Sequence, residues 1–358
     1  MGMMNFDNIY NGKRVLITGN TGFKGSWLTM WLLQLGADVY GYSNTVLTRP
    51  AMYKVLKLEK HIHQQWEDIR DSEKFVNYVK KIEPDFIFHL AAQAIVSTSY
   101  KQPLDTITTN VVGTASVMEA LRLYDKPVTA VIITSDKAYD NVEWLWGYRE
   151  TDRLGGKDVY SGSKGAAELV IKSYWHSFLK NKNNLRLGIA RAGNVIGGGD
   201  WSADRIVVDT IKAFADNQPV EIRSPKATRP WQHVLEPLSG YLRLGEVLYL
   251  RETDINGEAF NFGPRAGEPK TVKQLVEDIA KIWGIDNHIR ISGDIPFNEA
   301  TLLRLNCDKA LNLLQWQATL TYEETVQYVA EWYKAFYEKN TDMYPFTQQQ
   351  INNYCNLH

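Results

Sequence analysis

A tyrosine and a lysine stand four residues apart in the segment Tyr160-Ser-Gly-Ser-Lys164. On a helix, this spacing places the phenol and the ammonium on the same face. A tyrosine has an ordinary pKa of about 10, so it must lose its proton to act as a base near neutral pH. A neighbouring cation favours the phenolate. The pair is therefore typical of a site that removes a proton from an alcohol, although the pattern alone also occurs by chance on surface helices.

A second polar segment, Ser135-Asp136-Lys137, follows the apolar residues 130–134, which we expect to form a buried strand. In a doubly wound parallel sheet, the carboxyl ends of the strands line the ligand crevice, so these side chains should face Tyr160. A serine hydroxyl can hydrogen-bond the reacting alcohol, and a carboxylic acid can protonate a leaving hydroxyl. The alternative is a loop ion pair between Asp136 and Lys137.

Near the N-terminus, a short apolar run at residues 15–17 leads into Gly19, Gly22 and Gly25, and a helical pattern follows. This order predicts a βαβ unit whose glycine turn admits an anionic pyrophosphate to backbone amides and a helix N-terminus. A P-loop would need Ser or Thr directly after its lysine, whereas Gly25 follows Lys24. We expect a dinucleotide here, with these residues at the cofactor: Gly19, Gly22, Phe23, Lys24 and Gly25.

The end of the second predicted strand, at residues 39–42, bears on the choice of dinucleotide. A fold that selects NAD usually carries Asp or Glu there to hold the ribose hydroxyls. Here the place is taken by Tyr42, Ser43 and Asn44, with no carboxylate. A serine such as Ser43 can still hydrogen-bond an uncharged ribose, and NADP stays open on these residues alone.

The chemistry-bearing segments are joined by strands that alternate with helices, which predicts an α/β protein with a Rossmann-type, doubly wound parallel sheet. The chain becomes richer in Pro and Gly after residue 194, which indicates a smaller, mixed α/β substrate-binding lobe. We expect a dinucleotide-binding domain at residues 1–190 plus about 232–263, and the lobe at about 191–231 plus 264–358. The last polar residues, 341–358, are expected to form a loosely docked tail.

The composition excludes several function classes. The 358 residues include 40 basic and 41 acidic side chains, which argues against binding to nucleic acid or to an anionic membrane. The chain shows neither an apolar run long enough to span a membrane nor a signal-peptide core. Two cysteines, Cys307 and Cys355, provide neither a disulfide framework nor a metal-binding spacing, so no metal is expected and a cytoplasmic location is the simplest.

The glycine spacing and the Tyr160–Lys164 pair resemble the extended branch of the short-chain dehydrogenases. Within that branch, three segments resemble the nucleotide-sugar 4,6-dehydratases, and specifically their CDP-glucose subgroup: residues 135–137, 143–156 and 193–201. Most of these dehydratases read Thr-Asp-Glu where this chain reads Ser135-Asp136-Lys137. The resemblance implies tightly held NAD that is regenerated in each turnover, and a nucleotide-sugar substrate, CDP-glucose. It also implies a homodimer, with a tetramer possible, and a place in deoxysugar biosynthesis of the O-antigen type.

The same resemblance implies roles for individual residues. Tyr160 and Ser135 act on the C4 hydroxyl of the sugar while C4 is oxidised, and Lys164 holds the nicotinamide ribose. Asp136 donates a proton to the leaving C6 hydroxyl, and hydride then returns to C6. Lys137 takes the place of the glutamate that removes the C5 proton. Tyr160 itself or a water molecule is the alternative base, because a lysine can act as one only when it is neutral.

Other residues are assigned to ligands by the resemblance. Asp68 and Ile69 follow the probable third strand, where the superfamily binds adenine. A segment of small residues after the fourth strand lies along the cofactor: Leu90, Ala91, Ala92 and Gln93. Asn110, in a long predicted helix at residues 103–124, supports the site. A sugar nucleotide carries two phosphate charges, which arginines commonly clamp, and these residues are expected at the substrate: Asn194, Arg205, Arg229 and Arg304.

Several of these residues could instead have purely structural roles. Asp68 equally suits a loop charge, Gln93 a structural hydrogen bond, and each arginine a surface ion pair. For the whole protein, the alternatives are another nucleotide-sugar dehydratase, a 4-epimerase, or a dinucleotide sensor without catalytic activity. An epimerase would not need Asp136, and a sensor would not need an intact tyrosine–lysine pair.

Overall fold

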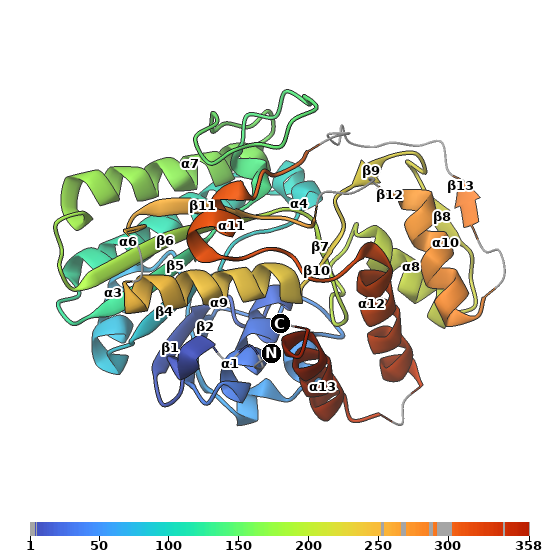
Figure 1. Cartoon of the computed structure of the whole chain (residues 1–358), viewed down its shortest axis with the longest axis horizontal. Helices are drawn as coiled ribbons and strands as arrows, with labels where there is room; N and C mark the ends of the chain where they lie inside the picture. The colour runs from blue at the N-terminus through green and yellow to red at the C-terminus, as the bar shows by residue number, and fades with distance from the viewer. Residues whose placement is uncertain are drawn as a thin grey trace.

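A seven-stranded sheet with the order β11-β6-β5-β4-β1-β2-β3 forms the centre of the protein (Figure 1). The computed structural model describes residues 4, 6–251, 254–265, 270–285, 289–291, 303–338 and 341–357. Every neighbouring pair of strands in this sheet is parallel. Its strands are β1 (Arg14–Thr18), β2 (Asp38–Ser43), β3 (His63–Trp66), β4 (Phe86–His89), β5 (Val128–Ile133), β6 (Leu185–Ala192) and β11 (Glu258–Phe262). The order reverses between β1 and β4, so the doubly wound sheet and its crevice are confirmed.

Both faces of the sheet are covered by helices, which explains why the strands are apolar along their whole length. Successive side chains of a strand point to opposite faces. Val15 and Ile17 therefore pack into one core, with helices α1 (Phe23–Gln34) and α9 (Leu235–Leu250), whereas Leu16 packs into the other. The second core is completed by helices α3 (Ser72–Ile82), α6 (Gly113–Leu123) and α7 (Val159–Tyr174).

The long helix predicted at residues 103–124 is present but contains a wider turn. It runs as α5 (Pro103–Ile107), the π-helical turn η3 (Thr108–Val112) and α6. Such turns are frequent at functional sites, and this one contains the buried Asn110. Helix α7 likewise continues into the π-helical turn η5 (Trp175–Leu179). Short helical elements complete this part of the chain: η1 (Phe6–Asn8), α2 (Met52–Val55), η2 (Leu58–Lys60), α4 (Val96–Lys101) and η4 (Asp136–Ala138).

The smaller group of elements lies beside the carboxyl ends of the strands, at the right of Figure 1. Within the described residues, this group consists of three helices and three two-stranded sheets, with β13 beside β8, β12 beside β9 and β10 beside β7. The helices are α8 (Ile206–Ala215), α10 (Val272–Trp283) and α12 (Tyr322–Tyr337). The strands are β7 (Val195–Ile196), β8 (Val220–Ile222), β9 (Thr228–Arg229), β10 (Gln232–His233), β12 (Lys270–Thr271) and β13 (Ile289–Ile291).

The C-terminal segment is a docked helix rather than the loose tail expected from its polarity. Helix α13 (Met343–Cys355) buries Ile351 and Tyr354 completely. The Tyr354 hydroxyl donates to Glu236 of α9 at 2.8 Å, and its ring packs edge-on against Trp31 of α1. The expectation was wrong because a few apolar residues at helical spacing are enough to dock a helix. A further helix, α11 (Asp308–Leu314), also packs against α9 and β11.

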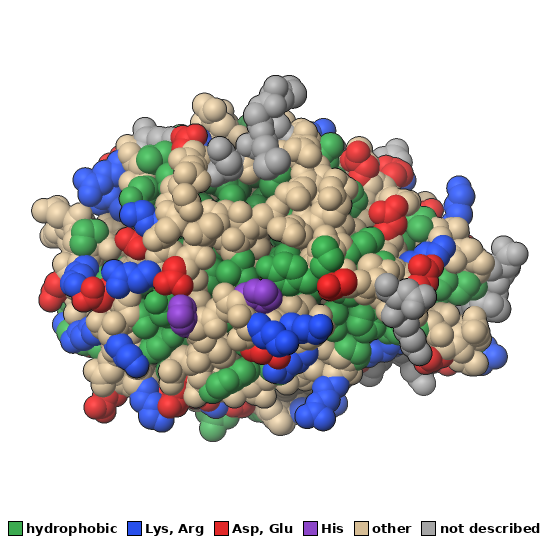
Figure 2. Space-filling model, turned by 90° about the horizontal axis from the view of Figure 1, so that it is seen from below, with side chains coloured by type: hydrophobic (Ala, Val, Ile, Leu, Met, Phe, Trp, Pro, Cys, Tyr) green, Lys and Arg blue, Asp and Glu red, His purple; other side chains and the backbone are tan. Residues whose placement is uncertain are grey.

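The surface carries both signs of charge. Figure 2 shows basic and acidic side chains interspersed over the face seen from below. No helix within the described part of the chain is long and apolar enough to cross a membrane.

Candidate active site

The glycine turn after β1 is packed too closely for any other residue type at two positions. Gly19 has φ +74°, and a Cβ there would lie 2.7 Å from the backbone nitrogen of Ala91. A Cβ on Gly25 would collide with the carbonyl oxygen of Gly19. Gly22 is the N-cap of α1, and no side chain among the described residues caps that end. The turn thus leaves the amides at the start of α1 open to an anion, which fits a dinucleotide pyrophosphate.

The segment after β4 lies against this turn. Leu90, Ala91 and Ala92 are each only partly buried, and the Ala91 amide donates to the Thr18 hydroxyl at 3.2 Å. The Gln93 side chain is held by groups of the protein, because its amide nitrogen donates to the Thr106 hydroxyl of α5 at 2.8 Å and to the Ile95 carbonyl at 3.0 Å. The Gln93 side chain thus makes structural hydrogen bonds, and its contact with the cofactor stays a prediction.

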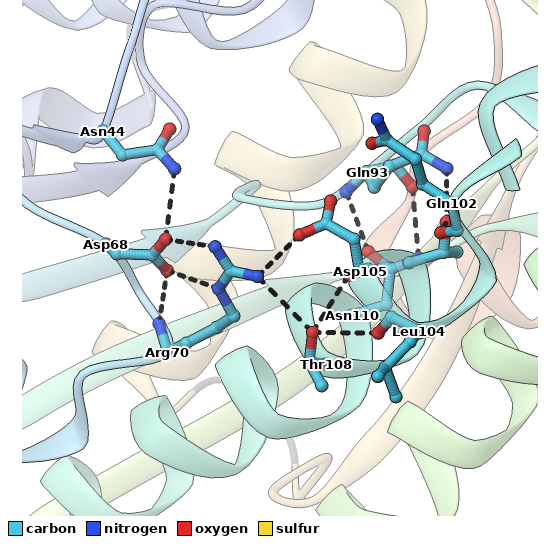
Figure 3. Close-up of polar contacts among 10 residues, drawn as sticks. Asn44, Asp68, Arg70, Gln93, Gln102, Leu104, Asp105, Thr108 and Asn110 are labelled. Carbon is cyan, nitrogen blue, oxygen red and sulfur yellow. Dashed lines mark hydrogen bonds and ion pairs between the residues drawn. The ribbon is translucent and has the colours of Figure 1, made fainter.

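Asn110 joins this loop to the helix that carries Tyr160. Its Oδ1 accepts from the Gln93 amide at 2.8 Å, and its Nδ2 donates to the Ser163 hydroxyl at 2.8 Å (Figure 3 shows its place beside Gln93). Because Ser163 precedes Lys164 on α7, the π-helical turn positions α7 relative to the loop after β4.

A fixed carboxylate stands at the end of β3. Asp68 accepts hydrogen bonds from Arg70 at 2.6 and 3.0 Å and from Asn44 at 3.3 Å (Figure 3). These bonds from Arg70 lower the pKa of the Asp68 carboxyl. Arg70 also donates to Asp105 of α5 at 2.6 Å. Sequence analysis named Asp68 but missed Arg70, whose partner on α5 is distant in sequence.

Ser43 and Ile69, the other residues proposed for the adenosine half, are buried. The Ser43 hydroxyl donates to Asn20 of the glycine turn at 2.8 Å, so it braces the turn. Ile69 packs against Gly113 of α6, where a Cβ would lie 2.8 Å from the isoleucine side chain.

Tyr160 and Ser135 are brought together, and the Ser135 side chain acts to lower the pKa of the Tyr160 phenol. Burial raises the pKa of Tyr160 to about 12, and the charge of Arg205 opposes this rise. Lys164 lies on the same side of α7, with its Nζ 5.9 Å from the centre of the Tyr160 ring. Burial lowers the pKa of Lys164 to about 8. Arg205, which was assigned to the substrate from the sequence, is thus the charge that lowers the pKa of the phenol most strongly.

Asp136 sits beside this pair, at the start of η4. The Ser135 hydroxyl donates to its Oδ1 at 3.0 Å, and the Lys137 Nζ donates to its Oδ2 at 3.2 Å. The Asp136 side chain is 5% exposed, whereas that of Lys137 is 28% exposed. The loop ion pair considered from the sequence is present, and it lies in contact with the hydroxyl that reaches Tyr160.

Lys24 brings another cation to the same region. Its Nζ lies 3.5 Å from the hydroxyl of Tyr241 on α9. Burial lowers the pKa of Lys24 to about 8, and the charges of Arg205 and Lys164 act in the same direction, against Asp136. Phe23, beside it, places its ring against Gly197 of the smaller group of elements. The site therefore gathers several cations around one buried carboxylate, which suits an anionic substrate.

The residues proposed for the substrate lie in different segments. Arg205 pairs with the buried Asp200 at 3.4 Å just before α8. Arg229 lies in β9 and donates to the Thr228 carbonyl at 3.0 Å. Arg304 is partly buried, and its carbonyl accepts from the Tyr148 amide at 2.8 Å. Asn194 is partly buried between β6 and β7. Their contacts with substrate stay predictions.

Comparison with known families agrees with this geometry. The model of the family described as "GDP-mannose 4,6 dehydratase" matches residues 16–329. The chain belongs to this family. Within the GDP-mannose 4,6 dehydratase family, it is 43% identical over 351 residues to the CDP-glucose 4,6-dehydratase of Salmonella typhimurium, covering 97% of each chain. It is 25% identical to the dTDP-D-glucose 4,6-dehydratase of Dictyostelium discoideum, covering 93% of this chain and 84% of the relative.

Solved structures share the fold of this family member. A dTDP-glucose 4,6-dehydratase from Bacillus anthracis, in complex with NAD, matches with a TM-score of 0.75 and 22% identity, covering 92% of this chain and 97% of its own. A UDP-glucose 4-epimerase from Thermotoga maritima, with UDP-glucose, matches with a TM-score of 0.77 and 23% identity, covering 89% and 97%. Both dehydratases and epimerases therefore use this architecture.

A buried ion pair that was not predicted from the sequence of this family member lies behind the site. Glu168 of α7 and Arg191 of β6 form it, and each side chain is 4% exposed. Glu168 stands four residues after Lys164, a spacing that places both on one face of the helix. That spacing was the available signal, but its partner on β6 is 23 residues further along the chain.

Proposed function

We propose that the protein is an NAD-dependent nucleotide-sugar 4,6-dehydratase that converts CDP-D-glucose to CDP-4-keto-6-deoxy-D-glucose. The observation that carries this proposal is the contact of one hydroxyl with two groups. Ser135 meets both Tyr160, the group for oxidation of an alcohol, and Asp136, an acid for loss of water. The 43% identity to a CDP-glucose 4,6-dehydratase over nearly the whole chain supports the substrate.

NAD fits the cradle between the glycine turn and the segment after β4. Bound there, the nicotinamide would provide the hydride acceptor for C4 of the sugar and the hydride donor for C6. The turn residues Gly19, Gly22 and Gly25 would hold the pyrophosphate, and Asp68 the adenosine half. Lys164 would hold the nicotinamide ribose. The fixed carboxylate of Asp68, which Asn44 contacts at the end of β2, favours NAD over a dinucleotide with an additional phosphate.

The first half of the proposed reaction uses Tyr160 as the base. Its phenolate takes the proton of the C4 hydroxyl, which Ser135 holds by a hydrogen bond, while C4 is oxidised to a ketone. Positive charges from Arg205 and Lys164 stabilise the phenolate, because a nearby cation favours the anionic form. The C4 ketone then acidifies the C5 proton.

The second half uses the Asp136–Lys137 pair. Elimination needs a neutral base for the C5 proton and a protonated acid for the C6 hydroxyl. Transfer of one proton across the 3.2 Å contact, from Lys137 Nζ to Asp136 Oδ2, produces both forms at once. Lys137 then takes the C5 proton and Asp136 protonates the leaving hydroxyl, so water is lost across C5–C6. When hydride returns to C6, Lys137 gives a proton back to C5, which completes the 4-keto-6-deoxy sugar. Tyr160 or a water molecule is the alternative C5 base.

The proposal also assigns a ligand to each of the two lobes and an oligomeric state to the protein. Residues 1–190 with about 232–263 bind NAD, and the remaining lobe, with Asn194, Arg205, Arg229 and Arg304, binds the nucleotide sugar. A homodimer is proposed, with a tetramer possible, because exposed apolar side chains gather on the helices from α5 to η5: Leu104, Ile107, Val112, Leu169 and Phe178. We also propose that the protein is cytoplasmic and that its product is used in the biosynthesis of deoxysugars of the O-antigen type.

The test is incubation of the purified protein and NAD with CDP-glucose and, in parallel, with UDP-, dTDP- and GDP-glucose. Loss of one water, measured by mass, and the alkali-induced absorbance of a 4-keto-6-deoxy sugar report dehydration. We expect dehydration of CDP-glucose alone. A folded, NAD-binding protein that dehydrates none of these sugars contradicts the proposal, and an epimerase assay then follows.

A further inference from the structure

The Glu168–Arg191 ion pair is linked by hydrogen bonds both to the end of β5, beside Ser135, and to residues 304–306. We propose that Arg191 is a positioning residue that fixes residues 303–306 and Tyr148 relative to Tyr160 and Ser135, acting through Glu168 on one side and Tyr139 on the other. The inference rests on the proposed function, because Arg304 is one of the residues proposed to bind the nucleotide sugar.

On the reaction-centre side, the Glu168 carboxylate ties together three elements. It accepts from Arg191 Nε of β6 at 2.8 and 3.0 Å, and from the hydroxyl of Thr134 at 2.6 Å. Thr134 directly precedes Ser135, and Glu168 follows Tyr160 and Lys164 on α7. The carboxylate therefore fixes the catalytic helix to the end of β5, where the serine and the acid stand.

On the other side of the ion pair, Arg191 is linked to Asn261 of β11 by hydrogen bonds through the Tyr139 hydroxyl. Its Nη1 donates to the Tyr139 hydroxyl at 2.7 Å, and the guanidinium lies 4.8 Å from the centre of that ring. The Tyr139 hydroxyl donates to Asn261 Oδ1 at 2.7 Å. The Asn261 Nδ2 in turn donates to the Tyr148 carbonyl at 2.8 Å and to the Asn306 carbonyl at 3.0 Å.

Tyr148 then holds residues 304–306 through the backbone. Its amide donates to the Arg304 carbonyl at 2.8 Å, and its carbonyl accepts from the Asn306 amide at 2.9 Å. The two segments approach so closely that a Cβ on Gly147 would lie 2.7 Å from the Asn306 nitrogen. A continuous set of hydrogen bonds thus runs from Arg304 to Thr134, next to the reacting groups.

Burying an ion pair is costly, and apolar replacements are often no less stable, so stability alone does not account for this one. The planar guanidinium offers donors in a fixed fork, which a lysine lacks. Here the fork bonds Glu168, Tyr139 and the Glu150 carbonyl at the same time. This arrangement suits a group that fixes the relative placement of several segments.

The first test is Tyr139→Phe, which removes one hydroxyl and keeps the ion pair. We expect KM for CDP-glucose to rise about tenfold, with little change in kcat, because a buried hydrogen bond on the path to Arg304 is lost. The matched control is Tyr124→Phe, which removes another buried phenol hydroxyl, 3.5 Å from the Pro84 carbonyl and outside this network. The control should leave KM unchanged.

A second readout does not depend on the proposed function. Hydrogen exchange of the Tyr148 and Asn306 amides, measured without substrate, should be faster in Tyr139→Phe than in Tyr124→Phe. Unchanged exchange in Tyr139→Phe overturns the inference, as does an unchanged KM in a wild-type protein that turns over CDP-glucose. A wild-type protein that dehydrates no sugar, while the exchange responds, contradicts the proposed function alone.

Glu168→Gln tests the reaction-centre side, because it keeps the size of the side chain and removes its charge. Glu168 favours the protonated form of Lys164, so the alkaline limb of the kcat profile should shift to lower pH. The other titratable groups around Lys164 are Tyr160 on α7, Lys24 on α1 and His89 on β4. A purely structural role would lower the yield of folded protein without moving this limb, and an unmoved limb in folded Glu168→Gln contradicts the coupling.

Discussion

Asp136 and Lys137 are adjacent in the chain and joined by an ion pair, yet one carboxylate oxygen also accepts from Ser135. The 3.0 Å bond from Ser135 Oγ to Asp136 Oδ1 places the acid beside the hydroxyl that contacts Tyr160. Oxidation of the alcohol and loss of water can therefore follow one another at the same sugar without its release.

Asp136→Asn should separate these two steps. The amide keeps the shape of the side chain but cannot donate the proton that the C6 hydroxyl needs, so dehydration should fall by about 10²- to 10⁴-fold. Oxidation at C4 should persist, and reduced nicotinamide should accumulate in rapid-mixing absorbance measurements. A control is Asp140→Asn, whose carboxylate lies in a loop ion pair with the exposed Arg153. Equal loss of both steps would show that Asp136 is needed before elimination.

The pH dependence of the free enzyme should have an alkaline limb near the pKa of Lys164, about 8. Below this pH the lysine is charged and stabilises the Tyr160 phenolate; above it the charge is lost, and kcat/KM should fall. The measurement is kcat/KM between pH 6 and 10. Lys24, whose pKa is also about 8, is distinguished by Lys24→Met. If the limb survives in Lys24→Met, it belongs to Lys164; its disappearance assigns it to Lys24.

Gly19→Ala should abolish NAD binding before it abolishes folding. A methyl group there meets the Ala91 backbone at 2.7 Å and requires a left-handed φ of +74°, so the turn must open. We expect the dissociation constant for NAD to rise at least tenfold, roughly the effect of 1.4 kcal/mol of strain at the cradle. Titration calorimetry measures the affinity, and circular dichroism reports the fold. Unchanged affinity would remove the turn from the cofactor site.

Acid should destabilise the protein through buried histidines. Burial lowers the pKa of His233 to about 3, whereas an unfolded histidine has a pKa of about 6.5. The folded form is therefore favoured above pH 6.5, and this contribution, on the order of 5 kcal/mol, is lost as the pH falls from 6.5 towards 3. Urea unfolding at several pH values should show a smaller loss in His233→Gln than in the wild type. An equal pH dependence in both would contradict the prediction.

Local patterns in the sequence determined much of the architecture. Apolar runs of strand length and helical spacing are set by neighbouring residues, so the parallel sheet and the common face of Tyr160 and Lys164 were predicted correctly. The glycine turn was equally local, because its requirement for Gly19 and Gly25 arises within one βα unit and its nearest neighbour.

Only the tertiary structure decided which distant groups meet. Arg205 acts on Tyr160, Arg70 fixes Asp68 through α5, and Glu168 pairs with Arg191 on another strand. These pairings depend on how elements far apart in the chain close on one another, and short-range periodicity carries no information about that. The same holds for α13, whose few apolar residues gained their partners on α1 and α9 only when the whole chain had folded.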